Sequence, residues 1–191
     1  MSSEPVVFST VAEGARKAFG PQLTPELHAK LKVAGFDLQN IQAAYPVGPF
    51  IRAIGVLCDA LVPGCPPEEQ HRLLGREFIA GYRQTAIGLA IFTMSRAIGV
   101  KRSLLRMGRN LRTTGNYLGA EVSELAPKSV QVVTQVLPEF RGRITPHELS
   151  VMNGYRLGVF EGMLLQLGVD GDAALEGGRD QPDATFRVSW R

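Results

Sequence analysis

The spacing of apolar residues changes near residue 117, and this change constrains the fold more than any other feature of the chain. Before it, apolar side chains recur at helical spacing, as Phe78, Tyr82 and Leu89 do. After it, YLGAEVSELAPKSVQVVTQVLP (117–138) has two β-rich halves about a polar Ala-Pro-Lys-Ser turn, which predicts a hairpin. Helices followed by hairpins predict an α+β domain with an antiparallel sheet.

The first part of the chain, 1–115, is expected to be an N-terminal helical bundle. Thr24 and Pro25 suit the cap and first position of one helix. The prolines of AAYPVGPF (43–50) predict a turn. The predicted elements are a short strand at 6–10 and helices at 23–35, 50–62, 68–99 and 100–112.

The second part, 116–191, is expected to form a ββαββ unit, so that residues 1–191 make a single domain. Its helix, 144–168, has Thr145 as N-cap, Pro146 at the first helical position and Glu148 three residues after the cap. Three glycines at four-residue spacing within it predict a groove where the helix lies flush on the sheet: Gly154, Gly158 and Gly162. Residues 172–190 predict a strand, a glycine-rich loop and a second strand.

Composition indicates an ordinary globular protein. The chain has 191 residues, of which 45% are hydrophobic and 20% are charged. Its N-terminus does not resemble a signal peptide, and the uncharged run 84–95 is too short to span a bilayer. Cys58 and Cys65 are separated by six residues, which fits no common redox or zinc motif. We therefore expect a cytoplasmic protein with no disulfide, metal or cofactor.

Positive charge is concentrated in the middle of the chain. No Asp or Glu occurs from Phe78 to Ala120, where seven of the 21 Lys and Arg residues lie, and the remainder is net acidic. One predicted interaction surface collects five of these cations: Lys101, Arg102, Arg106, Arg109 and Arg112. Their partners could be phosphates of nucleic acid or carboxylates of protein. The modest overall charge and scarce aromatic residues favour protein carboxylates.

Catalysis is not indicated by any motif. The chain lacks a nucleophile elbow, a zinc-protease motif, a phosphate loop and a dinucleotide fingerprint. His28, His71 and His147 each stand alone, which favours ordinary surface or helix-end imidazoles. Asp170-Gly-Asp172 does not continue into a calcium loop and is expected to be a turn. The sequence therefore favours a protein that is not an enzyme, and an unrecognised enzyme is the remaining alternative.

An apolar pocket is a further hypothesis. Aromatic residues on two predicted helices could line a pocket beside one cation, which would bind the carboxylate of an apolar anion. The candidate residues are Phe78, Tyr82, Arg83, Phe92 and Phe160. Apolar residues at helical spacing more often fill a solid core, so that alternative stays open.

Several sequence blocks resemble an uncharacterised paralogous family of myxobacterial proteins. They are LGREFIAGYRQTAIG (74–88), RTTGNYLGAEVSELAPKSVQV (112–132), TFRVSW (185–190) and, more loosely, AAYPVGPF (43–50). The family implies no activity. In architecture alone, the chain is similar to the superfamily of TRAPP subunits, vinyl-reductase-type domains and haem-NO-binding-associated domains.

That likeness implies a domain that dimerises through helices and holds a small apolar ligand. We therefore expect a ligand-binding or protein-interaction module with a role in signalling, which forms a homodimer or binds a protein partner. A basic surface for nucleic acid is the alternative.

Overall fold

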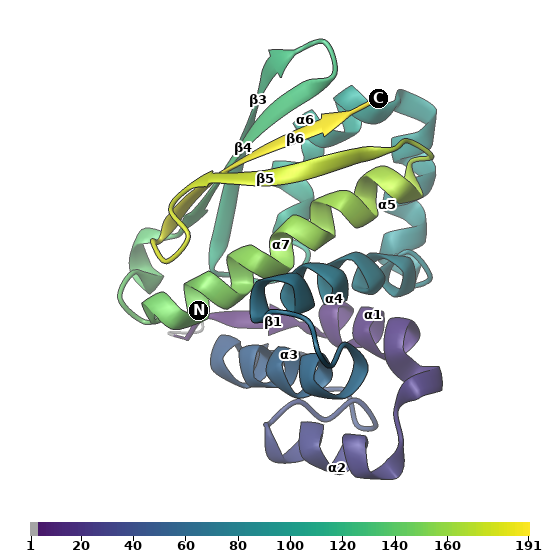
Figure 1. The fold of residues 1–191 in the computed structure, drawn as a ribbon, viewed down its shortest axis with the longest axis vertical. Coiled ribbons are helices and arrows are strands. Elements are labelled where there is room, and N and C mark those ends of the chain that lie inside the picture. Colours follow the sequence, from purple (N-terminus) through teal and green to yellow (C-terminus); the bar gives the residue numbers. More distant parts are fainter. Residues whose placement is uncertain (1–3) are drawn as a thin grey trace.

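The computed structural model describes residues 4–191, apart from the side chains of residues 108–110. Helices fill the first part of the chain and a sheet with one long helix fills the second (Figure 1). The elements are β1 (Val6–Phe8), α1 (Ser9–Phe19), η1 (Gly20–Gln22), α2 (Pro25–Val33), β2 (Ala44–Pro46), α3 (Val47–Leu61), α4 (Pro67–Tyr82), α5 (Ala86–Ile98), α6 (Val100–Leu111), β3 (Leu118–Ala126), β4 (Ser129–Val136), η2 (Pro138–Phe140), α7 (Pro146–Gln166), β5 (Gly171–Gly177) and β6 (Asp183–Trp190).

The main sheet is antiparallel, with strand order β3-β4-β6-β5. Its buried face alternates with its outer face along β4, where Val130 and Val132 are fully buried and Gln131 is not. Phe160 and Leu164 of α7 and Leu104 of α6 belong to the same apolar cluster. The α+β class, the hairpin and the ββαββ order are thereby confirmed.

Capping explains where two of the predicted helices begin. The Thr24 hydroxyl accepts a hydrogen bond from the Leu27 backbone N–H, and α2 begins at Pro25. Thr145 and Glu148 form a complete capping box, and α7 begins at Pro146. Both sequence predictions are confirmed, because these side chains satisfy N–H groups that the first turn leaves free.

The glycine row of α7 faces α4 and not the sheet, so that sequence prediction was wrong. A Cβ at Gly158 would overlap the carbonyl oxygen of Arg72, and one at Gly162 would lie 2.8 Å from that of Arg76. Gly75 reciprocates from α4, since a Cβ there would overlap the carbonyl oxygen of Tyr155. The two helix backbones therefore touch, and the face of α7 that meets the sheet is built from large side chains such as Phe160.

Four local predictions differ from the structure, one of them the turn expected at 170–172, where strand β5 begins at Gly171. The expected helix over 68–99 is two helices, because Thr85 accepts from the Gly88 N–H and donates to the Tyr82 carbonyl, ending α4 and starting α5. Residues 44–46 form strand β2, paired with β1, where a turn was predicted. The short first strand ends at Phe8, and α1, which follows it directly, was not predicted.

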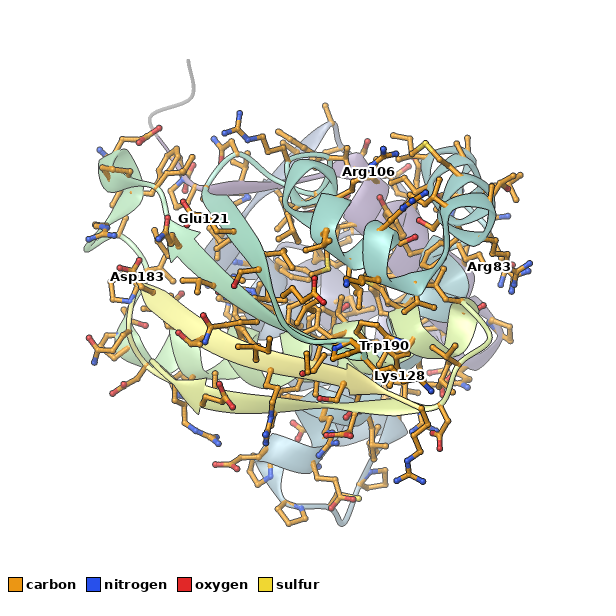
Figure 2. All side chains as sticks on the ribbon, turned by 90° about the horizontal axis from the view of Figure 1, so that it is seen from above. Arg83, Arg106, Glu121, Lys128, Asp183 and Trp190 are labelled. Atoms are coloured by element: carbon orange, nitrogen blue, oxygen red, sulfur yellow. The ribbon has the colours of Figure 1, made fainter. Side chains whose placement is uncertain are left out.

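Helix α6 packs against β3, at the edge of the sheet opposite β5, and the view from above shows the teal helices on one side of the yellow strands (Figure 2). Although α6 precedes residue 116, its Leu104 and Met107 pack into the sheet's cluster. The two apolar clusters therefore do not divide at residues 115 and 116, because α6, from the first part of the chain, belongs to the cluster of the sheet. Among the described residues, no helix is long and apolar enough to cross a membrane.

Candidate functional site

The five residues of the predicted apolar pocket do not surround one cavity. Phe78 and Tyr82 pack together in the helical core, with ring centroids 5.7 Å apart, and Phe92 belongs to that same core. Phe160 lies in the sheet's cluster against Phe186. Arg83 donates to the side-chain oxygen of Gln166 at 2.6 Å. None of the five lines any hollow described below, and a ligand-binding role for them stays a prediction.

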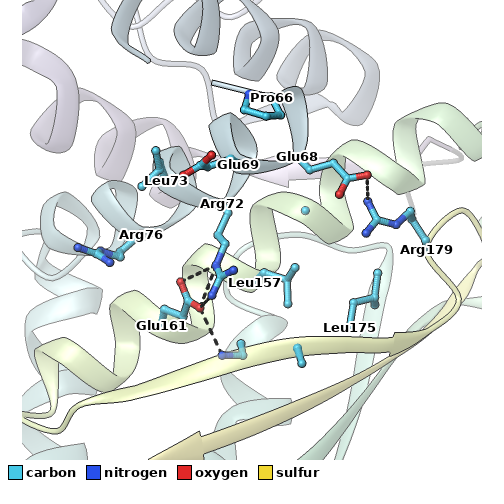
Figure 3. Close-up of a pocket in the computed structure, with 13 residues that line it drawn as sticks. Pro66, Glu68, Glu69, Arg72, Leu73, Arg76, Leu157, Glu161, Leu175 and Arg179 are labelled. Atoms are coloured by element: carbon cyan, nitrogen blue, oxygen red, sulfur yellow. Dashed lines mark hydrogen bonds and ion pairs between the residues drawn. The ribbon is translucent and has the colours of Figure 1, made fainter. Parts of the chain in front are cut away.

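A hollow of about 670 Å³ lies between α4, α7 and β5 (Figure 3). Charged side chains alternate around it with leucine and alanine side chains. We call it the Arg72–Glu161 hollow; it is lined by Pro66, Glu68, Glu69, Arg72, Leu73, Arg76, Gly154, Leu157, Glu161, Ala173, Ala174, Leu175 and Arg179. Most of the charged side chains come from α4, whereas β5 supplies only alanine and leucine side chains.

Arg72 and Glu161 form an ion pair across this hollow. The Glu161 side chain is only 8% exposed, and the Arg72 Nε–H lies 3.0 Å from each of its carboxylate oxygens. The backbone N–H of Ala173 in β5 donates to the same carboxylate at 3.3 Å. The hydrogen bonds with Glu161 raise the pKa of Arg72 above its ordinary value. One carboxylate thus joins α4, α7 and β5.

Local sequence explains how this pair forms. Glu161 lies on α7 directly before Gly162, in the part of the helix where glycines let α4 approach to backbone contact. That approach brings the side chain of Arg72 on α4 within reach of a carboxylate 89 residues later in the chain. A buried carboxylate needs such a partner, because an unpaired charge is costly to remove from water.

The rim of the hollow carries further charges. Arg179, in the loop between β5 and β6, lies 2.6 Å from Glu68 at the start of α4. Arg76 is exposed, and no ion pair among the described residues includes it. Arginine at such a rim suits a carboxylate or phosphate, while Leu157 and Leu175 offer apolar contact. The arrangement can accommodate a small molecule with an anionic group and an apolar part.

The loop beside this hollow is fixed to α7 by Asn153. The Asn153 amide donates to the carbonyl oxygens of Gly178 and Arg179 at 3.2 and 2.8 Å. Its own oxygen accepts from Arg156 at 2.6 Å. Because of this anchor, Arg179 reaches the rim from a loop whose backbone is held in place.

A second hollow, of about 530 Å³, lies between α3, α4 and the start of α7 and contains Cys58, His71 and His147. Burial, and secondarily the neighbouring His147, lower the pKa of His71. Burial raises the pKa of the Cys58 thiol to about 12, which keeps it protonated and unreactive. Within the described part of the chain, no cluster of three or more His, Cys, Asp or Glu side chains could hold a metal ion.

The predicted basic surface is only partly matched by carboxylates. Lys101 pairs with Glu124 of β3. Arg102, Arg106 and Arg112 are exposed, and the ion pairs of the described residues include none of them. The side chain of Arg109 lies outside the described residues.

Two other cations of the acid-free stretch meet the end of a helix. Arg96 donates to the backbone carbonyl of Gln166, at the C-terminal end of α7, and Arg83 binds the side chain of the same residue. The C-terminal end of a helix carries partial negative charge, so it takes the place of a carboxylate.

Comparison with protein families gives a match over nearly the whole chain. A family model described as "Protein of unknown function (DUF2378)" matches residues 6–191. The chain belongs to the DUF2378 family. No curated protein matches this DUF2378 chain in sequence.

Solved H-NOX structures share the fold of the DUF2378 chain. An oxygen-binding H-NOX domain related to soluble guanylate cyclases has a TM-score of 0.64 and 14% identity, covering 95% of this chain and 92% of that one. A structure from work on haem distortion in the H-NOX family has a TM-score of 0.64 and 13% identity, with 96% and 94% covered. A mutant H-NOX from T. tengcongensis has a TM-score of 0.59 and 13% identity, with 95% and 94% covered. At such identities, the likeness establishes the fold.

Sequence reasoning missed the Arg72–Glu161 hollow. Glu161 was a visible signal, because it is an acid directly before the last glycine of the row. Its partner could not be assigned, since the glycine row was expected to face the sheet rather than α4.

Proposed function

We propose that the protein is a non-catalytic, ligand-binding signalling module whose ligand is a small molecule with an anionic group and an apolar part. The Arg72–Glu161 hollow would hold that molecule. The observation that carries the proposal is the buried Glu161 carboxylate, which joins α4, α7 and β5 inside a hollow with arginines on its rim. The H-NOX-like fold, found in oxygen-binding domains, supports a role in ligand binding.

The ion pair supplies a way to sense the ligand. An incoming carboxylate or phosphate would be attracted first by Arg76, which has no ion pair among the described residues. Deeper in the hollow, the anionic group of the ligand would compete with Glu161 for the guanidinium of Arg72. Any loss of that pairing would alter the hydrogen bond from Ala173 to Glu161, and thereby the position of β5. A ligand shifts a conformational equilibrium by making such different contacts in two states.

One of the similar H-NOX structures comes from work on haem distortion. The residues present in this chain do not fit a haem group. Haem iron takes an axial His, Cys, Met or Tyr ligand inside an enclosed pocket. His28 lies on α2, His71 and His147 lie at the second hollow, and Cys58 is held as a thiol by its raised pKa. The tyrosines and Met152 are packed into the helical core, Met107 and Met163 pack into the sheet's cluster, and Met94 is exposed.

The remaining expectations belong to the same proposal. A non-catalytic role agrees with the contacts of Glu161, because its buried carboxylate is bound by the Arg72 guanidinium and the Ala173 backbone N–H. A homodimer and a cytoplasmic location stay predictions.

Titration calorimetry with octanoate tests the proposal, with octanamide as the uncharged control of the same length. Octanoate is expected to bind and to raise the melting temperature, because a ligand of the folded state stabilises it. Arg76→Gln should weaken octanoate binding about fivefold or more, since it removes one charge-assisted contact. Arg143→Gln, at an exposed site outside this hollow, should bind as the wild type does.

Two results would count against this function. Equal binding of octanoate and octanamide would show that the arginines do not select the ligand. Binding of neither probe, nor of inorganic phosphate, at millimolar concentration would remove the support for an anion site.

A further inference from the structure

Helix α5 is mostly exposed, although most of its residues are apolar. Arg96 is its one charged residue, yet of its 13 residues only Gly88, Phe92 and Ser95 are buried. Three large apolar side chains of α5 stand in solvent: Ile87, Leu89 and Met94, with Leu89 59% exposed. Exposed apolar patches on folded proteins mark interaction sites, so the exposed face of α5 is a candidate for one.

Helix α6, which packs against α5, adds exposed charge. Its inner residues Leu104 and Met107 are buried against the sheet, while Arg102 and Arg106 are exposed together with Leu105 between them. Figure 2 shows Arg106 on the side of the molecule formed by the teal helices, away from the yellow strands β5 and β6. The exposed residues Ile87, Leu89, Met94, Arg102, Leu105 and Arg106 are called the α5–α6 surface.

Charge decides which partner suits this surface. The acid-free stretch from Phe78 to Ala120 leaves Arg102, Arg106 and Arg112 without a carboxylate among the described residues. A second copy that presented the same surface would bring these arginines against one another, which is unfavourable. The partner must therefore be negatively charged and also accept apolar side chains. Nucleic acid meets the first condition but offers little to exposed leucine and methionine.

Shape separates a lipid surface from an acidic protein. Neither of the two hollows described above is lined by α5 or α6. Protein partners gain most of their affinity from anchors that fill pockets, whereas a bilayer receives side chains that protrude. Helices that lie on membranes combine leucine and other apolar side chains with flanking Lys and Arg.

We propose that the α5–α6 surface binds the surface of an anionic lipid bilayer. Leu89, Met94 and Leu105 would enter the boundary between headgroups and acyl chains, and Arg102 and Arg106 would bind lipid phosphates. The protein would lie on the membrane, consistent with the absence of a membrane-spanning helix among the described residues. This inference is independent of the ligand in the Arg72–Glu161 hollow.

Vesicle flotation with the full chain tests the proposal. The protein is expected to float with vesicles containing 30% phosphatidylglycerol and not with pure phosphatidylcholine, and salt should weaken the binding. Each cation near such a surface is worth roughly a fivefold change in affinity, so Arg102→Gln with Arg106→Gln should lower it about 25-fold. Leu89→Ser with Met94→Ser should also reduce binding to anionic vesicles.

Matched controls are available elsewhere on the molecule. Val33→Ser replaces an exposed apolar residue of α2, and Arg143→Gln replaces an exposed arginine before α7. Both should float as the wild type does. Circular dichroism of each variant checks that the fold is kept.

Other outcomes would overturn the proposal. Equal flotation with neutral and anionic vesicles, or none with either at low salt, contradicts it. A dimer in sedimentation equilibrium that Leu89→Ser disperses would assign the surface to a second copy. Binding to polyglutamate that is as tight as binding to anionic vesicles would assign it to an acidic protein.

Discussion

Helices α4 and α5 follow one another in the chain, yet they are used in opposite ways. Helix α4 carries five charged residues and still touches the backbone of α7 along one face. Helix α5 carries one charged residue and is mostly exposed. Apolar content alone therefore does not decide which helix is buried. What distinguishes α4 is the complementarity of its Gly75 with the glycines of α7, which allows a contact that larger residues would prevent.

The α4–α7 contact should be the most sensitive part of the fold. Gly158→Ala places a Cβ on the backbone of Arg72, which cannot move without displacing α4. We expect a loss of about 3 kcal/mol in the free energy of unfolding, measured with urea. Gly55→Ala is the control, because a Cβ at this α3 glycine meets nothing within 4 Å. That variant should gain up to about 1 kcal/mol.

Breaking the ion pair at the same contact should have the next largest effect. Arg72→Ala leaves the buried Glu161 with the Ala173 N–H and no cation. We expect a loss of about 2 kcal/mol on unfolding by urea. Arg179→Ala breaks an exposed pair with Glu68 and should cost less than about 1 kcal/mol. Equal losses in the two variants would contradict the difference in burial.

A smaller effect should appear as a pH dependence. His71 lies against Gly154 at the α4–α7 contact, and burial lowers its pKa below the ordinary value of 6.5. The unfolded chain therefore binds a proton there at a higher pH than the folded protein does, so stability should decrease as pH falls through about 6.5 toward the folded pKa. Melting temperatures from pH 8 to pH 5 would measure this decrease. In His71→Gln it should be smaller.

The exposed side of α5 should be the least sensitive. Leu89→Ser should change the free energy of unfolding by no more than about 0.5 kcal/mol, because its side chain is already in solvent. Phe92→Ala, three residues later on the buried side, should cost about 3 kcal/mol. A large loss for Leu89→Ser would mean that α5 is covered in the free protein, and the contrast with α4 would fail.

Local signals in the sequence predicted much of the fold. Thr24 and Thr145 are caps whose partners lie three residues away, so the helices that they start could be located directly. The alternation along β4 and β6 predicted the strands because one face of the sheet is buried. The break at Thr85 was missed, since apolar spacing continues across it and only the hydroxyl's two hydrogen bonds reveal it.

Long-range pairings account for what the sequence could not predict. β2 is too short to show a pattern, and it is a strand only because Tyr45 lies opposite Val7. The glycine row of α7 indicated a close approach but not the element that approaches, and α4 proved to be that element. Hence the Arg72–Glu161 hollow, formed by that approach, could not be assigned.

The stretch without acids also contains no histidine between Phe78 and Ala120, and all but one of its cations are arginines. Arginine stays protonated at any pH that a cell reaches. The positive potential over α5 and α6 is therefore permanent, unlike the charge at His71. Acidification cannot switch this positive potential on or off. Binding at the α5–α6 surface must therefore be controlled by ionic strength or by the lipid composition of the membrane.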